Sequence, residues 1–311
     1  MNTQNSEHLI KRYLQHCQYE KGLSDKTLKA YLIDLTQFSH FIGGTLQDCD
    51  KETVQNYLSQ LHTHYKAKSV KRKIASLKAF FNYLDAEEVI EYNPFNKLRI
   101  KLHEPFLLPK TIPLNTIDSL LQCAYKKKNT FGNELSYQYQ STLRDIAVLE
   151  LLFATGMRVS ELCSIRADGI DLIEGVIKIY GKGAKERIIQ IGNPGVRSAV
   201  SCYYEAFSDR IHKAGWFFVN RLGNQLSDQS VRNMINVYVD SAGIEQHITP
   251  HMFRHSFATL LLEEDVDIRY IQRLLGHSSI TTTQIYTHVT SKKQRDILTT
   301  KHPRNKISLP K

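Results

Sequence analysis

The chain has 311 residues, of which 41% are hydrophobic and 10% aromatic, so it can build the cores of two ordinary domains and is not disordered throughout. Lys and Arg number 41 against 31 Asp and Glu, and the net charge of +10 favours a polyanionic partner, nucleic acid before an anionic membrane. The five cysteines form no CxxC pair, which argues against a disulfide framework or a cysteine-based zinc site and favours reduced thiols.

The start of the chain, MNTQNSEHLIKRYLQ, places charged residues inside its apolar stretch and lacks the core of a signal peptide. No run of 18 apolar residues occurs that would span a bilayer. We therefore expect a cytoplasmic protein that does not enter a membrane.

Four helical patterns and no strand signal occupy the first 84 residues. Apolar residues recur at helical spacing in 7–20, 24–43, 51–64 and about 67–84. Ser24 can cap the second pattern, and Gly43-Gly44 ends it. These patterns predict a small four-helix domain.

The fourth pattern also carries a run of basic residues, Lys66, Lys68, Lys71, Arg72, Lys73 and Lys78. Most charge runs form a solvated helix face, but the acidic residues that usually share such a face are missing, since no Asp or Glu occurs from 53 to 84. One apolar face for packing and one basic face suit a helix that lies against DNA phosphates. We predict that these six residues contact DNA.

A proline-rich stretch follows this domain: four of the eight prolines are Pro94, Pro105, Pro109 and Pro113. Proline blocks helix continuation and favours extended backbone. We therefore expect a first domain at 1–103, a linker at 104–113 and a second domain at 114–311.

The second domain opens with a predicted helix at 114–127, a polar segment at 128–141 and an apolar, buried helix at 142–154. Gly156 then permits a turn, and Arg158 opens a new helix with Glu161 three residues on. An Arg at a helix N-terminus can bind an anion. The alternative is an ordinary surface Arg paired with Glu161.

Residues 175–191 alternate and are rich in Val and Ile around Gly181-Lys182-Gly183, which predicts a β-hairpin with Lys182 near its tip. The GKG sequence is not a phosphate-binding P-loop, because it lacks the spacing and the following helix. Taken alone, Lys182 would be a solvated loop residue. Two further helices are expected at 195–210 and 227–241, and a short buried strand or turn at 216–219.

The stretch 249–289 concentrates His, Arg and Tyr. Thr249-Pro250 predicts a helix start, and His251 and Arg254 would then share one helix face. His251 and His255 have the i, i+4 spacing of zinc ligands, but no Glu follows the first His and no third ligand is evident. We expect no metal site here, and a structural role for His255.

Downstream, Ile268, Ile271, Leu274 and Leu275 repeat at helical spacing and stop at Gly276, a predicted C-cap. Gly276 would deliver His277 at a helix end. Ser278 or Ser279 can cap a further short helix that carries Tyr286. A basic, His-bearing pocket with a Tyr brought to it is what attack on a phosphodiester requires.

Five motifs appear in order: ATGMRVSEL at 154–162, YGKGAKER at 180–187, HMFRH at 251–255, LLGH at 274–277 and IYTHV at 285–289. Together they resemble the tyrosine recombinase (phage integrase) superfamily, and most closely its Xer-type site-specific recombinases. The likeness covers almost the whole chain. It departs at Met157, at Met252-Phe253 and in the length of the segment 128–141.

The resemblance implies a mainly α fold, with an N-terminal four-helix core-binding (SAM-like) domain and a largely helical catalytic domain that holds a small antiparallel β-sheet. It implies a site-specific DNA recombinase that cuts and rejoins DNA through a 3′-phosphotyrosine, in Xer-like chromosome-dimer resolution or in mobile-element integration and excision. The implied partner is double-stranded DNA with a specific recombination site, held by a homo- or hetero-tetramer on synapsed duplexes. No cofactor and no metal are expected.

The resemblance also assigns six catalytic positions: Arg158, Lys182, His251, Arg254, His277 and Tyr286. Tyr286 would attack the phosphodiester, and because a Tyr of pKa ~10 is scarcely ionised near pH 7, it needs cationic surroundings or a base. Lys182 resembles the general acid that protonates the leaving 5′-oxygen.

The two arginines would hold the non-bridging phosphate oxygens, because their planar, permanently charged groups match phosphate and neutralise the transition state. His251 and His277 would hydrogen-bond the phosphate and assist proton transfer. Glu161 would orient Arg158.

Two other functions fit parts of the pattern. A type IB topoisomerase shares the Arg, Lys, His and Tyr chemistry but relaxes supercoils as a monomer, so a target-site requirement and Holliday-junction products would separate it from a recombinase. A catalytically inactive DNA-binding regulator is disfavoured because every expected catalytic residue type is present.

Overall fold

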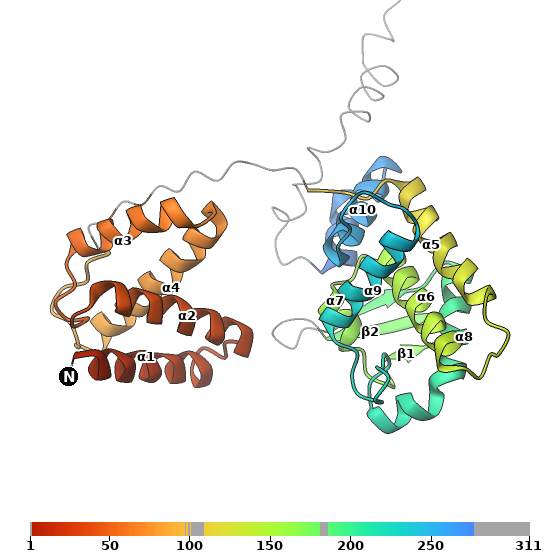
Figure 1. Ribbon diagram of the computed structural model, residues 1–311, viewed down its shortest axis with the longest axis horizontal. Helices are drawn as coiled ribbons and strands as arrows, with labels where there is room; N and C mark the ends of the chain where they lie inside the picture. The colour runs from red at the N-terminus through yellow and green to blue at the C-terminus, as the bar shows by residue number, and fades with distance from the viewer. Residues whose placement is uncertain (1, 97, 99, 101–108, 181–185, 277–311) are drawn as a thin grey trace, which may run out of the picture. The chain divides into compact units, whose positions relative to one another are not determined.

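The computed structural model describes residues 2–96, 98, 100, 109–180 and 186–276. The chain divides into two compact units, Met1–Phe106 and Leu107–Lys311, and each is described by itself. Figure 1 shows a bundle of helices in the first unit and helices around a small sheet in the second.

The first unit contains the four predicted helices, α1 (Asn2–Tyr19), α2 (Asp25–Ile42), α3 (Lys51–His64) and α4 (Ala67–Ala86). The hydroxyl of Ser24 accepts a hydrogen bond from the Thr27 amide, and Gly43 ends α2 in the left-handed region at φ 63°. Both boundary residues therefore act as the sequence predicts.

Aromatic side chains form the centre of this unit. The rings of Tyr13 and Phe80 lie 5.1 Å apart between centroids, and those of Phe38 and Phe81 lie 5.8 Å apart. All four side chains are buried. The unit therefore has a hydrophobic core of its own.

The second unit contains seven helices among its described residues, α5 (Leu114–Asn129), α6 (Tyr137–Thr155), α7 (Val159–Cys163), α8 (Pro194–Ala214), α9 (Asp228–Ser241), α10 (Pro250–Glu263) and α11 (Ile268–Leu275). Its antiparallel sheet has the order β1 (Ile170–Asp171), β2 (Val176–Tyr180) and β3 (Glu186–Gln190). Helices thus dominate both units, and the predicted fold class is confirmed.

The predicted hairpin is present, with Val176 opposite Gln190 and Tyr180 opposite Glu186. Strand β1 was not predicted, because two residues are too short to show alternation. Helix α6 begins earlier than predicted, at Tyr137, because Ser136 caps it by accepting a hydrogen bond from the Tyr139 amide. The residues 137–141 of the polar segment are therefore helical.

Helix α6 is the buried centre of the second unit and contacts α5, α8 and α10 (Figure 1). Its residues Ile146 to Leu149, together with Leu151 and Leu152, are buried. The helix ends at Gly156, whose φ of 59° turns the chain toward Arg158 at the start of α7. None of the described helices has the length and apolar character of a membrane span.

Candidate active site

The turn between α6 and α7 positions Arg158, as the sequence predicts. Arg158 precedes α7 with an extended backbone, and its side chain is 38% exposed. Its guanidinium Nη1 donates to Oε1 of Glu161 at 2.7 Å, and its backbone amide donates to Oε2 at 2.8 Å. The pairing holds the guanidinium beside the helix start while leaving part of it open to solvent.

Glu161 is the buried anion of this site, with a side chain only 7% exposed. Besides Arg158, Arg187 on β3 donates to its two oxygens at 2.9 and 2.8 Å. Burial by itself would raise the pKa of Glu161, but the hydrogen bonds from Arg187 and from the backbone of Arg158 outweigh it and lower the pKa to about 2. Glu161 is therefore a carboxylate at neutral pH, held between two guanidinium groups.

Arg254, on α10, is buried with 4% of its surface exposed. Its Nη1 donates to the carbonyl of Gly156 and its Nη2 to the carbonyl of Leu275, each at 2.8 Å. These two bonds fix the plane of the guanidinium. They also join the turn before Arg158 to the last residue of α11.

His251 and His255 lie on the first turns of α10, where His251 is exposed and His255 is half-buried. Thr249 precedes the helix and Pro250 opens it, as predicted. Both histidines line a hollow of about 540 Å³ that also includes Lys110 and His247. Burial, followed by the charges of His251 and Arg254, lowers the pKa of His255 to about 4, so this imidazole is neutral at pH 7.

No group of three or more His, Cys, Asp or Glu suited to a metal ion occurs among the described residues. A zinc ion bound by His251 and His255 would need a third ligand. No His, Cys, Asp or Glu among the described residues completes such a group. Whether the site works without metal stays a prediction.

Helix α11 ends at Gly276 in the left-handed region at φ 64°, which confirms the predicted C-cap. Arg187 packs on this glycine so closely that a Cβ added there would lie 2.9 Å from Nη1. The chain therefore passes directly beside Arg187 one residue before His277.

Lys182, His277 and Tyr286 lie outside the described residues, and their placement stays a prediction. The structure does place the segments that lead to two of them: β2 ends at Tyr180 and β3 begins at Glu186 on either side of Lys182, and α11 ends before His277. It places the Arg254 guanidinium against the carbonyl of Gly156, in the turn that leads to Arg158. Arg158 and Arg187 both bind the Glu161 carboxylate, and with Arg254 beside the turn the cations outnumber the carboxylate, which suits the region to an anion.

Arg187 stands in the YGKGAKER motif, but the motif alone predicts no role for it. The alternating pattern of residues 175–191 predicts only that Arg187 lies on a strand. Its partner Glu161 lies 26 residues earlier, so spacing along the chain carries no signal for the pair.

The basic residues predicted to contact DNA divide into two groups. Lys66, Lys68, Lys71, Arg72 and Lys78 are exposed. Lys73 is not, with 2% of its surface exposed, and it donates to Oδ1 of the buried Asp34 at 3.0 Å. Because Lys73 lies in the interior of the first unit, it is removed from the predicted DNA-facing set.

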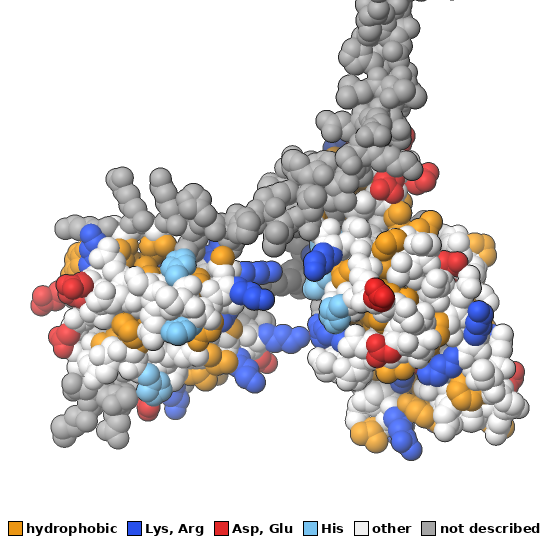
Figure 2. Space-filling view, turned by 45° about the horizontal axis from the view of Figure 1, so that its top comes forward, with side chains coloured by type: hydrophobic (Ala, Val, Ile, Leu, Met, Phe, Trp, Pro, Cys, Tyr) orange, Lys and Arg blue, Asp and Glu red, His pale blue; other side chains and the backbone are white. Residues whose placement is uncertain are grey.

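Figure 2 shows Lys and Arg side chains gathered along one edge of the first unit. On α4, the exposed residues Lys68, Lys71 and Lys78 are separated by helical spacing and form a stripe opposite the buried Leu77, Phe80 and Leu84. This arrangement matches the two-faced helix that the sequence predicts.

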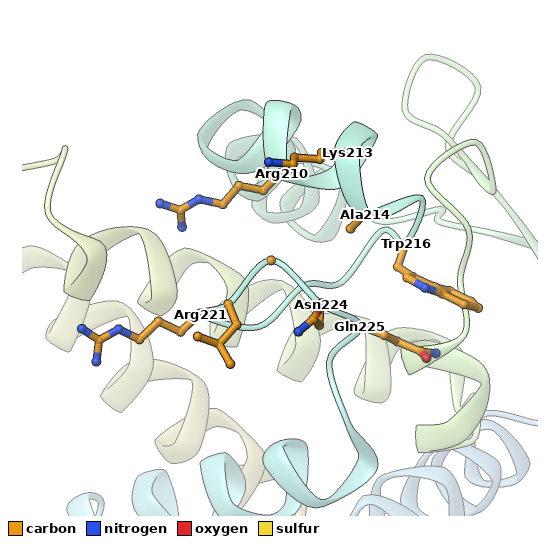
Figure 3. Close-up of a pocket in the computed structure, with 9 residues that line it drawn as sticks. Arg210, Lys213, Ala214, Trp216, Arg221, Asn224 and Gln225 are labelled. Atoms are coloured by element: carbon orange, nitrogen blue, oxygen red, sulfur yellow. The ribbon is translucent and has the colours of Figure 1, made fainter.

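A second hollow, of about 520 Å³, lies at the end of α8 and holds none of the predicted residues. Figure 3 shows Arg210 and Arg221 extending in the same direction from it, while Trp216 lies on the opposite side. Both guanidinium groups lie 5.7 Å from the ring of Tyr137, and Arg166 stacks on Trp216. The ring contacts explain the local packing of these arginines.

Known proteins resemble this chain over most of its length. Residues 126–293 match the phage integrase family, and residues 10–88 match the N-terminal SAM-like domain of phage integrases. A tyrosine recombinase of Agathobacter rectalis is 52% identical over 95% of this chain and 96% of its own length. The tyrosine recombinase XerC of Thermodesulfovibrio yellowstonii is 35% identical over 97% of this chain and 98% of its own.

Among solved structures, XerA recombinase is 27% identical and covers 96% of this chain and 99% of its own, with a TM-score of 0.53. XerH site-specific recombinase, in a pre-cleavage complex with difH substrate, has a TM-score of 0.75 over 95% of this chain and 97% of its own. At 21% identity, the XerH likeness shows the fold.

Proposed function

The chain belongs to the phage integrase family and is a tyrosine-type site-specific DNA recombinase, and from this premise we propose that six of its residues carry the reaction. They are Arg158, Lys182, His251, Arg254, His277 and Tyr286. The observation that carries the proposal is the pair of hydrogen bonds from Arg254 to Gly156 and Leu275. One guanidinium thereby joins the turn that bears Arg158 to the helix end that precedes His277.

Cleavage follows from these roles. The phenolic oxygen of Tyr286 gives up its proton to one of the two histidines and forms a bond to the phosphorus, as the bond from phosphorus to the 5′-oxygen breaks. Lys182 supplies the proton that the leaving 5′-oxygen takes up. Arg158 and Arg254 offset the negative charge that builds on the non-bridging oxygens, where a preorganised cation contributes most.

The two histidines complete this set. His251 is the exposed residue of the otherwise buried first turn of α10, from which its imidazole can reach a phosphate oxygen. His277 would follow Gly276 at the end of α11. The phosphotyrosine keeps the energy of the broken bond, and a 5′-hydroxyl of a second strand reverses the step. Strand exchange therefore needs neither ATP nor a metal ion.

The DNA partner is a duplex with a specific recombination site, bound in part by the exposed residues Lys66, Lys68, Lys71, Arg72 and Lys78 on and before α4. Structures of XerH bound to difH substrate before and after cleavage support DNA binding by this fold. Exchange between two duplexes requires four active subunits, which makes a homo- or hetero-tetramer on synapsed DNA the working form. We place the protein in the cytoplasm, acting in chromosome-dimer resolution or on a mobile element.

Replacing Tyr286 by Phe tests the assignment, because it removes the attacking oxygen and keeps the ring. The DNA would be a binding site selected from random duplexes and nicked beside the cleavage position, so that the covalent complex is trapped. We expect the wild type to form an adduct that survives denaturing electrophoresis, and Tyr286→Phe to form none while its gel-shift affinity is unchanged.

The matched control is Tyr270→Phe, which alters an exposed tyrosine of α11 and should form adducts at the wild-type rate. Adducts formed by Tyr286→Phe would contradict the nucleophile assignment. Relaxation of supercoils on DNA without the selected site would instead indicate topoisomerase activity.

A further inference from the structure

Arg187 and Glu161 form a buried ion pair at the start of α7. We propose that Arg187 is a positioning residue for DNA cleavage, which sets the place and the charge of Arg158 through Glu161. The proposal rests on the function proposed for Arg158 above.

Two hydrogen bonds hold the Arg187 guanidinium and the Glu161 carboxylate in a fixed geometry. Arg187 donates from Nη1 to Oε1 and from Nη2 to Oε2 of Glu161, at 2.9 and 2.8 Å. Two parallel bonds between planar groups fix orientation as well as distance, which a Lys cannot do. The side chains of Arg187 and Glu161 are 16% and 7% exposed, so water screens the pair little.

The location of Arg187 connects this pair to the hairpin. Arg187 is the second residue of β3 and lies opposite Ile179 of β2. It lies on the same face of the strand as the buried Ile189, which directs it toward the interior and α7. Because Lys182 stands between β2 and β3, the ion pair links the hairpin of the proposed general acid to the helix that begins beside Arg158.

The same side chain also contacts the segment before His277. A Cβ on Gly276 would lie 2.9 Å from Nη1 of Arg187 and 3.0 Å from its Cδ. Arg187 thus contacts both the end of α11 and the carboxylate that holds Arg158. Three motifs that are far apart in sequence meet at this one side chain.

The positive charge of Arg187 also affects how strongly Arg158 attracts a phosphate. Arg158 and Glu161 together are neutral, so the pair by itself would attract a phosphate weakly. Arg187 adds one positive charge to the same carboxylate, which leaves Arg158 with net attraction for an anion. Without Arg187, Glu161 would be a buried carboxylate that depends on Arg158 alone, and would hold it away from the phosphate.

The test compares single-turnover cleavage of the nicked duplex with gel-shift affinity and melting temperature for each variant. In Arg187→Met we expect cleavage to slow by about 100-fold, as small displacements of a reacting group do, while site affinity stays within about twofold. Arg187→Lys, which keeps the charge but loses the paired bonds, should fall between Met and wild type. Arg197→Met is the control, since Arg197 donates to backbone carbonyls of Ile173 and Ile191, and it should cleave normally.

A second substitution separates positioning from simple stabilisation. Adding Glu161→Gln to Arg187→Met removes the uncompensated charge. We expect the double variant to cleave at least about tenfold faster than Arg187→Met alone. Wild-type cleavage by Arg187→Met, or a loss matched by its melting temperature and not relieved by Glu161→Gln, would overturn the proposal. Adducts formed by Tyr286→Phe would instead overturn the proposed function, so the two failures are distinguishable.

Discussion

His255 shows how one side chain in the candidate site is kept neutral. It follows Arg254 on α10, is half-buried, and lies in the same hollow as His251. Burial and the neighbouring charges lower its pKa from 6.5 to about 4. A second cation beside Arg254 would cost energy, so the fold favours the uncharged ring.

A stability measurement can test this state. Between pH 6.5 and 4 the unfolded chain binds a proton at His255 that the folded chain does not, so the free energy of unfolding should fall as the pH is lowered through this window. His255→Gln should make the fall shallower than in the wild type, as measured by urea unfolding at pH 7 and pH 5. Glu161 stays ionised in the folded chain, but in the unfolded chain it has its ordinary pKa of 4.5, so it adds to the fall mainly below the pH 5 at which the variants are compared.

The control for this experiment is His62→Gln, which changes an exposed residue of α3. It should leave the pH dependence close to that of the wild type. An unchanged pH dependence in His255→Gln would show that the imidazole is not the group that resists protonation.

At the same scale, the sequence identified residues whose partners are near in the chain. Glu161 stands one helical turn after Arg158, so their pairing was predictable from spacing. The contacts of Arg187 with Glu161 and Gly276 join positions far apart in the chain, and only the folded sheet brings them together. Likewise, nothing in the HMFRH motif showed that Arg254 would be buried and bonded to backbone carbonyls.

At the scale of elements, α4 combines packing and proposed binding on opposite faces. Its buried face carries Leu77, Phe80 and Leu84, and its exposed stripe carries Lys71 and Lys78. A helix of this kind can lie on its unit and still present cations to a phosphate backbone.

Two lysines of α4 therefore differ in what their removal should do. Lys78→Ala removes an exposed charge, so we expect weaker DNA binding and unchanged stability. The slope of log affinity against log salt concentration should fall by about one.

Lys73→Ala leaves the buried Asp34 with Arg72 as its remaining cation, so it should cost about 3 kcal/mol of folding free energy. Gel shifts over a series of salt concentrations and urea unfolding measure the two effects.

The opposite pattern would contradict this division of roles. If Lys73→Ala kept full stability and lowered the salt slope, Lys73 would belong to the DNA-contacting face. If Lys78→Ala bound DNA with the wild-type slope, the stripe would be a solvated face.

The elements themselves were largely predictable, and the errors have physical reasons. The four helices of the first unit and the hairpin have strong periodicity and clear boundary residues. Lys73 is buried because helical spacing puts it on the same side as the buried Val70 and Leu77, whereas the run of basic residues by itself predicts an exposed face. Strand β1 was missed because it is held by pairing with β2 and not by its own sequence.

At the scale of the whole molecule, each unit has a separate hydrophobic core. Phe80 is fully buried among Tyr13 and Phe81 in the first unit, and Phe207 is buried beside Tyr203 in the second. Because these cores share no side chain among the described residues, a cavity in one should weaken that unit first.

Phe80→Ala tests this independence, since truncating a buried Phe costs about 3–5 kcal/mol and leaves a cavity that the α1 and α4 side chains only partly fill. In hydrogen exchange read by mass spectrometry, we expect faster exchange in peptides of residues 2–96 and no change in those of 109–276. Phe207→Ala should give the mirror result, with faster exchange confined to 109–276. Faster exchange in both ranges from either substitution would show that the two units unfold as one cooperative unit. The proposed DNA binding through α4 and the proposed phosphate chemistry at Arg158 would then not belong to two independently stable units.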